Sequence, residues 1–252
     1  MTKIRVSAVK YTNSIPFIYG LQNDPLHNEI SLSLDTPAQC YNNLLSGNAE
    51  VGLVPVIIKN HVSQLFQVSP FGIGAIGDVL SVILVSGCPL NKVKTVTLDY
   101  QSRTSVMLAR LLCSDYWNIN PVFLEAKPGF EDAMFGEYEA KVIIGDRALH
   151  FHRQKDVYIT DLAGEWTKFT GLPFVFAIWA STTKLPIKFE QKFTDALRYG
   201  LSCKEKLIID LQTQPEYGSI DLSGYLNHNI IHEINSPMLE GMNLFLHLIR
   251  DL

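Results

Sequence analysis

The sequence predicts an α/β fold, in which short parallel strands carry helices on both faces and a helical tail follows. Three observations lead to this class. Strand-type and helix-type runs alternate through residues 4–85, the same alternation returns through 93–144, and the chain becomes helical after Pro186. Hydrophobic residues make up 47% of the 252 residues and charged residues 18%, which is enough apolar surface for a sizeable core.

The first alternating unit begins almost at the amino terminus. Thr36 followed by Pro37 is typical of a helix start, because Thr caps the free N–H groups and Pro suits the first turn. The expected elements are a strand over 4–9, a helix over 16–21, a strand over 31–34, a helix from 37 to about 47, and strands over 51–54 and 79–85.

The second unit starts near residue 90 and has the same order of elements. The stretch 133–144 echoes 44–54, since each has a helix end, a Gly, a short polar link and a buried strand. The expected elements are strands over 93–98, 121–124, 141–144 and 173–180, and helices over 103–113, 129–137, 187–211, 221–233 and 238–250.

Ligands of such sheets bind beyond the carboxyl ends of the strands. The loops of interest are therefore 10–15, 55–60, 99–105 and 145–148. The third loop is the most informative, because it joins a strand to a helix with three hydroxyls and one guanidinium: Ser102, Arg103, Thr104 and Ser105. Helix N–H groups, hydroxyls and an Arg fork together suit a small organic anion. The alternative is an ordinary helix cap with a solvated Arg103.

Three further positions are candidates with equally simple alternatives. Asn13 follows the first strand, where its amide could bind a ligand hydroxyl or cap the next helix. Ser81 is the one polar side chain in its apolar strand, and it lies in no nucleophile motif. Gly145 and Asp146 end a strand and open a helix, so that Asp146 either caps that helix or faces a ligand.

Charge and composition exclude several classes of partner. The formal net charge is −4 and the basic residues are scattered, so we expect neither nucleic-acid nor membrane binding. The chain enters a strand pattern directly and has no long apolar run, which favours the cytoplasm. The four cysteines lack metal-type spacing and are expected to be reduced thiols. Nothing in the sequence sets an oligomeric state.

No metal or organic cofactor is expected. His228 and His232 are four residues apart, but no third ligand accompanies them, and two histidines on a helix surface are the simpler interpretation. The glycines at 72–77 precede a strand instead of following one, which disfavours a dinucleotide site.

Several stretches, in order, resemble the chorismate dehydratases of the futalosine route to menaquinone. They are Asn13-Ser14-Ile15-Pro16, Asp35-Thr36-Pro37, residues 51–55, 77–82, Ser102-Arg103-Thr104-Ser105, residues 144–149, and Trp166 with 170–179. The resemblance covers about residues 4–180 and departs at Gly77-Asp78, where the family usually has Gly-Pro. Asp78 could reshape this loop or place a carboxylate near the substrate.

The resemblance implies a two-lobed periplasmic-binding-protein-like (type II) fold with two crossover strands and a helical C-terminal tail. Residues 1–88 and 181–252 would form lobe 1 and residues 89–180 lobe 2, with the ligand in the cleft between them. Asn13 and Ser81 would be catalytic, and Ser102–Ser105 with Gly145 and Asp146 would bind the substrate.

The implied reaction removes water from chorismate to give 3-[(1-carboxyvinyl)oxy]benzoate. No His lies in a matched motif, and neither Ser nor Asn is a good base at neutral pH. We therefore expect a carboxylate of the substrate itself to take the proton, with Asp146 as the alternative base. Two other functions stay open from the sequence: a non-catalytic binder of small carboxylates, and the sister enzyme of the pathway, which makes dihydroxynaphthoate.

Overall fold

Two compact units make up the chain. A computed structural model describes residues 3–151 and 157–252. Its packing groups Met1–Gly74 with Val175–Asn235, and Ala75–Phe174 with Ser236–Leu252. The lobe boundaries predicted from the sequence stay a prediction. In this grouping the last helix goes with the second unit, because Phe245 packs on Trp166 and Phe174 at ring-centroid distances of 6.0 and 4.9 Å.

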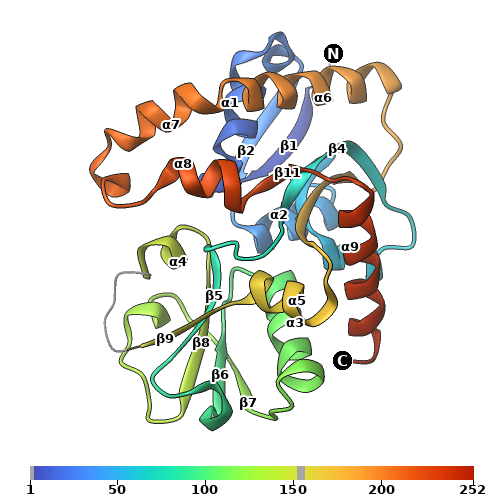
Figure 1. Ribbon diagram of the computed structural model, residues 1–252. Coiled ribbons are helices and arrows are strands. Elements are labelled where there is room, and N and C mark those ends of the chain that lie inside the picture. Colours follow the sequence, from blue (N-terminus) through green and yellow to red (C-terminus); the bar gives the residue numbers. More distant parts are fainter. Residues whose placement is uncertain (1–2, 152–156) are drawn as a thin grey trace. The chain divides into compact units, whose positions relative to one another are not determined.

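The first unit is built on a six-stranded sheet with the order β11-β4-β10-β3-β1-β2 (Figure 1). β1 pairs in parallel with both β2 and β3, whereas β10 runs antiparallel to β3 and β11 antiparallel to β4. The strands are β1 (Ile4–Val9), β2 (Ile30–Asp35), β3 (Val51–Pro55), β4 (Phe66–Ala75), β10 (Phe174–Ser181) and β11 (Ile231–Glu233). The parallel part brings the loops after β1 and β3 to one edge.

Helices α1 and α6 of this unit approach closely, because two glycines face the contact. A Cβ on Gly20 would lie 2.0 Å from the carbonyl oxygen of Ala196, and one on Gly200 would lie 1.9 Å from that of Pro16. The helices are α1 (Ile15–Asn23), α2 (Pro37–Leu45), α6 (Ile187–Ser202), α7 (Lys204–Gln212) and α8 (Leu222–Gly224). As predicted, Thr36 caps α2, in a capping box with Gln39.

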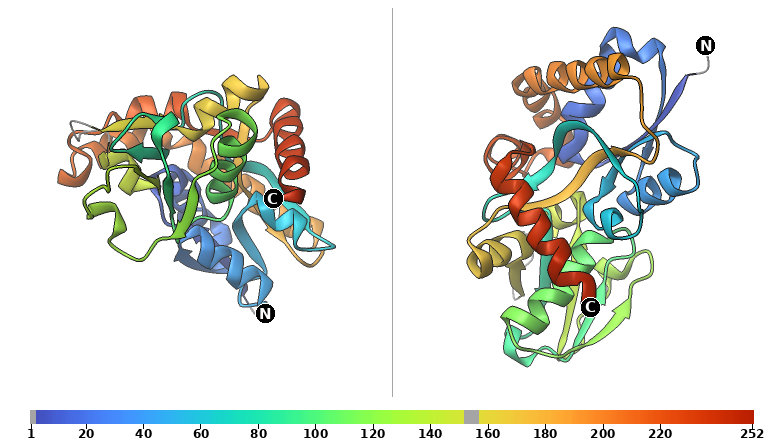
Figure 2. Two further views of the ribbon diagram at one scale, coloured as in Figure 1. Left: turned by 90° about the horizontal axis from the view of Figure 1, so that it is seen from below. Right: turned by 90° about the vertical axis from the view of Figure 1, so that its right-hand side faces the viewer.

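The second unit is built on a five-stranded sheet with the order β7-β6-β8-β5-β9. β6 is parallel to β7 and β8, while β5 is antiparallel to β8 and β9. The strands are β5 (Val82–Ser86), β6 (Thr95–Leu98), β7 (Val122–Glu125), β8 (Glu139–Ile144) and β9 (Tyr158–Asp161). The helices are α3 (Thr104–Leu111), α4 (Asp146–Phe151), α5 (Leu162–Thr170) and α9 (Ser236–Leu248), the red helix near the C-terminus in Figure 2. Both sheets are therefore mixed. The expected parallel strands form in β1, β2 and β3 and in β6, β7 and β8, whereas β5 and β10 run antiparallel to their neighbours.

The helix predicted over 129–137 is wrong, since only the 3₁₀ turn Phe130–Asp132 forms there. Gly129 before it is left-handed, with φ of 84°. The buried amino group of Lys141, on β8, donates to the carbonyl oxygens of Phe130 and Ala133 at 3.0 and 2.5 Å. The Phe130 carbonyl also accepts the Ala133 N–H at 3.3 Å, which closes the 3₁₀ turn.

Three other elements also differ from the expectation. The long helix 187–211 is two helices, α6 and α7, with Cys203 between them. The helix expected over 221–233 is a short α8, the π turn Tyr225–Asn229 and then strand β11. The strand expected over 79–85 begins only at Val82, because Leu80 is left-handed with φ of 62°. Strands β4, β9 and β11 and helix α5 were not predicted.

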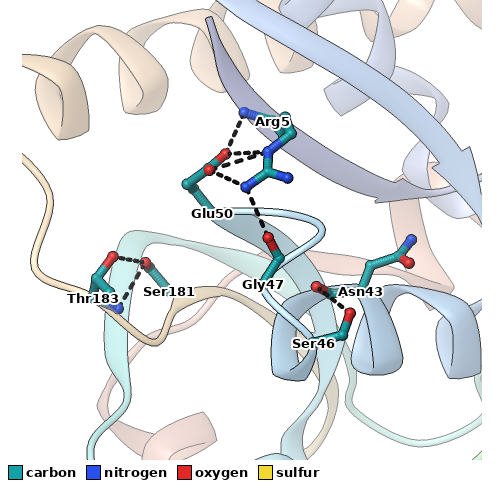
Figure 3. A network of polar contacts seen from close by, with 7 residues as sticks. All are labelled: Arg5, Asn43, Ser46, Gly47, Glu50, Ser181 and Thr183. Carbon is teal, nitrogen blue, oxygen red and sulfur yellow. Dashed lines mark hydrogen bonds and ion pairs between the residues drawn. The ribbon is translucent and has the colours of Figure 1, made fainter. Parts of the chain in front are cut away.

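A polar network binds the starting ends of β1 and β3 in the first unit (Figure 3). Arg5 donates from its backbone and guanidinium groups to the Glu50 carboxylate, and its Nη2 donates to the carbonyl of Gly47 at 2.7 Å. Since parallel strands start at the edge opposite their carboxyl ends, this exposed network lies away from the loops of interest. Its role is structural, and such exposed ion pairs contribute little stability.

Candidate active site

Two neighbouring strands of the second unit end beside each other and gather most of the predicted residues. β6 and β8 are parallel, so the loop that follows Leu98 and the loop that follows Ile144 leave the same edge of the sheet. Ser81 joins this edge from the antiparallel strand β5, because its carbonyl oxygen accepts a hydrogen bond from Gly145 N–H at 2.8 Å. The structure therefore brings together Ser81, Gly145 and the 99–105 loop.

Asp99 ties the two loops to each other. Its carboxylate follows β6 directly and is buried. It accepts bonds from the N–H groups of Gln101 and Ile144 at 2.9 and 3.0 Å. Arg147 Nη2 donates to both carboxylate oxygens, at 2.9 and 2.7 Å. Burial raises the pKa of Asp99, which Arg147 opposes, and these donors all favour the ionised carboxylate.

Asp99 and Arg147 were not among the residues selected from the sequence. The sequence does show two opposite charges, each just after a strand of the second unit. They indicate an ion pair only once β6 and β8 are known to be neighbours in the sheet. Arg147 also forms an ion pair with Glu131 at 3.2 Å and lies over the rings of Tyr100 and Phe130. Arg147 therefore stabilises the loops that follow β6 and β8.

Ser102 bonds to the first turn of helix α3, whose N-cap residue is Arg103. Its Oγ accepts the N–H of Ser105 at 3.0 Å, and its own N–H donates to the carbonyl of Asp99 at 3.2 Å. One of the helix N–H groups expected to bind an anion is thus already bonded within the protein. Arg103 precedes α3 and is half-buried, while Thr104 and Ser105 are buried in its first turn.

A strained turn presents Ser81. Leu80, directly before it, adopts the left-handed conformation that a branched side chain disfavours. Asp161 stabilises this turn, because its Oδ2 accepts the Leu80 N–H at 2.7 Å while its Oδ1 caps α5 through Ala163 and Gly164. The Ser81 hydroxyl is buried and has a contact of only 3.5 Å with the carbonyl of Val79, which is long for an O–H donor.

Asp146 and Asp78 both lie near helix starts. Asp146 is the first residue of the short helix α4, after the left-handed Gly145 with φ of 65°. Asp78 lies against the first turn of α5, since a Cβ on Gly164 would come within 2.0 Å of its Oδ1. A carboxylate at this position interacts favourably with the helix dipole, which gives Asp78 a structural role.

Asn13 belongs to the first unit and lies in the 3₁₀ turn Thr12–Ser14, between β1 and α1. It is 8% exposed, and its Oδ1 accepts the Ser14 hydroxyl at 3.1 Å. The residue that precedes α1 is Ser14, and its side chain makes no capping bond. Asn13 is thus a turn residue, as the simpler interpretation expects, but its Oδ1 bonds to the Ser14 hydroxyl and not to an N–H group of α1.

The two histidines considered as a metal pair lie in different environments. His228 is exposed in the π turn, whereas His232 lies on β11 and is buried, so that the expected pair on a helix surface is wrong. Within residues 3–151 and 157–252, no three His, Cys, Asp or Glu side chains gather as metal ligands. All four cysteines are free thiols. None of the described helices is long and apolar enough to cross a membrane.

Comparison with protein families gives a match over residues 4–251 to a family described as menaquinone biosynthesis. The chain belongs to this family. A chorismate dehydratase of Thermus thermophilus is 29% identical over 214 residues, which covers 74% of this chain and 78% of the relative. A chorismate dehydratase of Campylobacter jejuni is 22% identical over 241 residues, with 94% of this chain and 93% of the relative covered.

Solved structures place this member of the menaquinone biosynthesis family in the periplasmic-binding-protein-like fold. A protein of Archaeoglobus fulgidus has a TM-score of 0.73 at 15% identity, with 99% of this chain and 96% of that one covered. The aliphatic sulphonate binding protein SsuA of Escherichia coli has a TM-score of 0.64 at 17% identity, with 99% and 87% covered. The two-lobed fold expected from the resemblance is confirmed.

Proposed function

We propose that this chain is a hydro-lyase that dehydrates chorismate to 3-[(1-carboxyvinyl)oxy]benzoate in menaquinone biosynthesis. Membership of the menaquinone biosynthesis family carries the proposal, and the two chorismate dehydratase relatives give it a substrate. The gathering of Ser81, Gly145 and the 99–105 loop at one sheet edge supports it.

The reaction sets three tasks for the protein. A proton leaves the ring carbon that bears the enolpyruvyl ether, the hydroxyl on the neighbouring carbon departs, and the ring becomes aromatic. The proton and the hydroxyl together make up the water that is lost. The protein must hold two carboxylates, stabilise the departing hydroxyl and provide for the proton.

The start of α3 suits the first task. Arg103, directly before α3, carries a guanidinium whose planar fork matches a carboxylate. The Thr104 and Ser105 hydroxyls and the positive end of the α3 dipole add to the attraction. Ser102 contributes through its bond from the Ser105 N–H, which holds the first turn in place.

Ser81 and Asn13 suit the second task. The long contact of the Ser81 hydroxyl leaves its proton free to turn toward a better acceptor. Among the described residues, the amide nitrogen of Asn13 has no acceptor, so its N–H groups are available to a substrate oxygen. In this proposal each residue supplies a hydrogen-bond donor for a substrate oxygen.

A carboxylate of the substrate takes the proton in this proposal. Asp99 is unsuited, because its two oxygens already accept several hydrogen bonds. Correct placement of the substrate can lower a barrier by ~7–11 kcal/mol in well-aligned cases. Asp146 is the alternative base. Loss of turnover with unchanged binding in Asp146→Asn would favour Asp146 over the substrate carboxylate.

Purified protein incubated with chorismate tests the function directly. We expect the substrate to disappear while an equal amount of the aromatic ether forms, as measured by liquid chromatography with mass detection. Ser81→Ala, at the same concentration, is the matched control for contaminating activity. Binding of chorismate without product would instead indicate a non-catalytic protein. We also propose a cytoplasmic location, where the four free thiols would stay reduced.

A further inference from the structure

His232 lies far from Asn13 in the sequence but contacts it in the first unit. It is the middle residue of β11, the edge strand that pairs with β4, and only 6% of its surface is exposed. The edge of the Phe17 ring meets its imidazole at a centroid distance of 5.0 Å and an angle of 83°. Phe17 in turn packs on Phe71 and Trp179, so the orientation of the imidazole is fixed by an aromatic cluster.

The polar contact of this ring is directed at the Asn13 turn. His232 Nε2 lies 2.8 Å from the backbone carbonyl oxygen of Asn13. A carbonyl oxygen only accepts, so Nε2 must carry the proton. Burial, and to a smaller extent the charge of Lys204 on α7, lower the pKa of His232 to about 4, whereas the contact with Asn13 opposes this shift. The ring is therefore neutral near pH 7 and protonated on Nε2.

A buried histidine at this place has a cost that a phenylalanine would avoid. Burial of a polar ring is unfavourable unless its polar atoms are bonded, whereas Phe would fill the same aromatic cluster with no polar ring atom to bury. What the imidazole adds is a rigid donor against one carbonyl of the turn Thr12–Ser14. That turn is short and closes through a bond from Ser14 N–H to the Tyr11 carbonyl at 2.9 Å.

We propose that His232 is a positioning residue for catalysis: its Nε2–H fixes the backbone of Asn13 and thereby orients the Asn13 amide toward the substrate. This inference rests on the proposed function, in which Asn13 donates to a substrate oxygen. His232 is unsuited to take a proton from the substrate, because burial disfavours the imidazolium that would form.

Two substitutions of His232 separate the donor from the packing. His232→Phe keeps the aromatic shape and removes the donor, while His232→Gln keeps an amide N–H near the position of Nε2. We expect the Phe variant to lose about tenfold in kcat with KM changed less than about threefold, the size expected for one lost hydrogen bond. The Gln variant should recover most of this loss.

Ser86→Ala is the matched control, because the buried Ser86 hydroxyl also donates to a backbone carbonyl, that of Cys88, at 2.7 Å. It lies at the end of β5 remote from Ser81, and its loss should lower the melting temperature while leaving kcat unchanged. A kcat loss in His232→Phe no larger than in Ser86→Ala would overturn the proposal.

Asn13→Ala and the double variant with His232→Phe complete the experiment. If His232 acts through Asn13, the double variant should be no slower than Asn13→Ala alone. Additive losses would overturn the positioning role while leaving the function of Asn13 intact. Unchanged turnover in Asn13→Ala would instead remove Asn13 from the site, and the inference with it. Should His232→Phe fail to fold, His232→Asn, whose amide is too short to reach, takes its place.

Discussion

Acid should destabilise the first unit through protonation of His232. The pKa of this group is 6.5 in an unfolded chain and about 4 in the folded protein. A pKa that is lower in the folded state means that the unfolded chain binds more protons between these values. The contribution of His232 to stability is therefore complete above pH 6.5 and is lost as the pH falls toward 4.

The magnitude follows from the size of the shift. Each pKa unit corresponds to about 1.4 kcal/mol, so the contribution of His232 to the free energy of unfolding should fall by about 3 kcal/mol between pH 7 and pH 4. Its cause is mainly the cost of burying the imidazolium, with repulsion from Lys204 in addition.

Urea unfolding of the wild type and of His232→Gln at several pH values between 7 and 4 measures this term. Other groups titrate in both proteins, so the difference between the two curves isolates His232. We expect the wild type to be the more stable at pH 7 and to lose about 3 kcal/mol more than the variant by pH 4. Parallel curves for the two proteins over this range would refute the reasoning. Fluorescence and circular dichroism should be followed together, because the two units can unfold separately.

Four further outcomes are expected. Arg103→Ala should weaken chorismate binding by about 10- to 100-fold and Arg103→Lys by less, since one charge-assisted contact is worth ~1.5–3 kcal/mol; equal kinetics would remove Arg103 from the site. Ser81→Ala should lower kcat by about 10²–10³ with little change in KM, if its donor acts where charge develops; a raised KM alone would make Ser81 a binding residue. Asp161→Asn should lower both the melting temperature and kcat, because the N–H of the strained Leu80 loses its acceptor. Wild-type activity in this variant would show that catalysis does not depend on the strained turn. Incubation with a chelator should leave turnover unchanged, and activity lost and then restored by a defined metal would contradict the absence of a metal requirement.

Local patterns predicted several elements of the fold. The strand over 4–9, the capped helix after Thr36 and the strand over 51–54 were placed correctly, because alternation and capping are properties of neighbouring residues. The helix predicted over 129–137 fails for the opposite reason. The carbonyls of Phe130 and Ala133 bond to the amino group of Lys141, and no pattern within the segment reveals that partner.

The residues of the candidate site also fall into those that the sequence indicates and those that only the structure reveals. The sequence by itself determined which loops follow strands, and so selected Asn13, Ser102–Ser105 and Gly145, since strand ends and helix starts are written in adjacent residues. Only the tertiary structure decided that Arg147 and the N–H of Ile144 bond to Asp99, that Asp161 holds the turn before Ser81, and that His232 supports Asn13. Each of these contacts joins residues that are distant in the chain. Their proximity follows from which strands become neighbours in a sheet and from how helices pack on it. Because a buried polar group needs a hydrogen-bond partner, these contacts form between residues that no local sequence pattern connects.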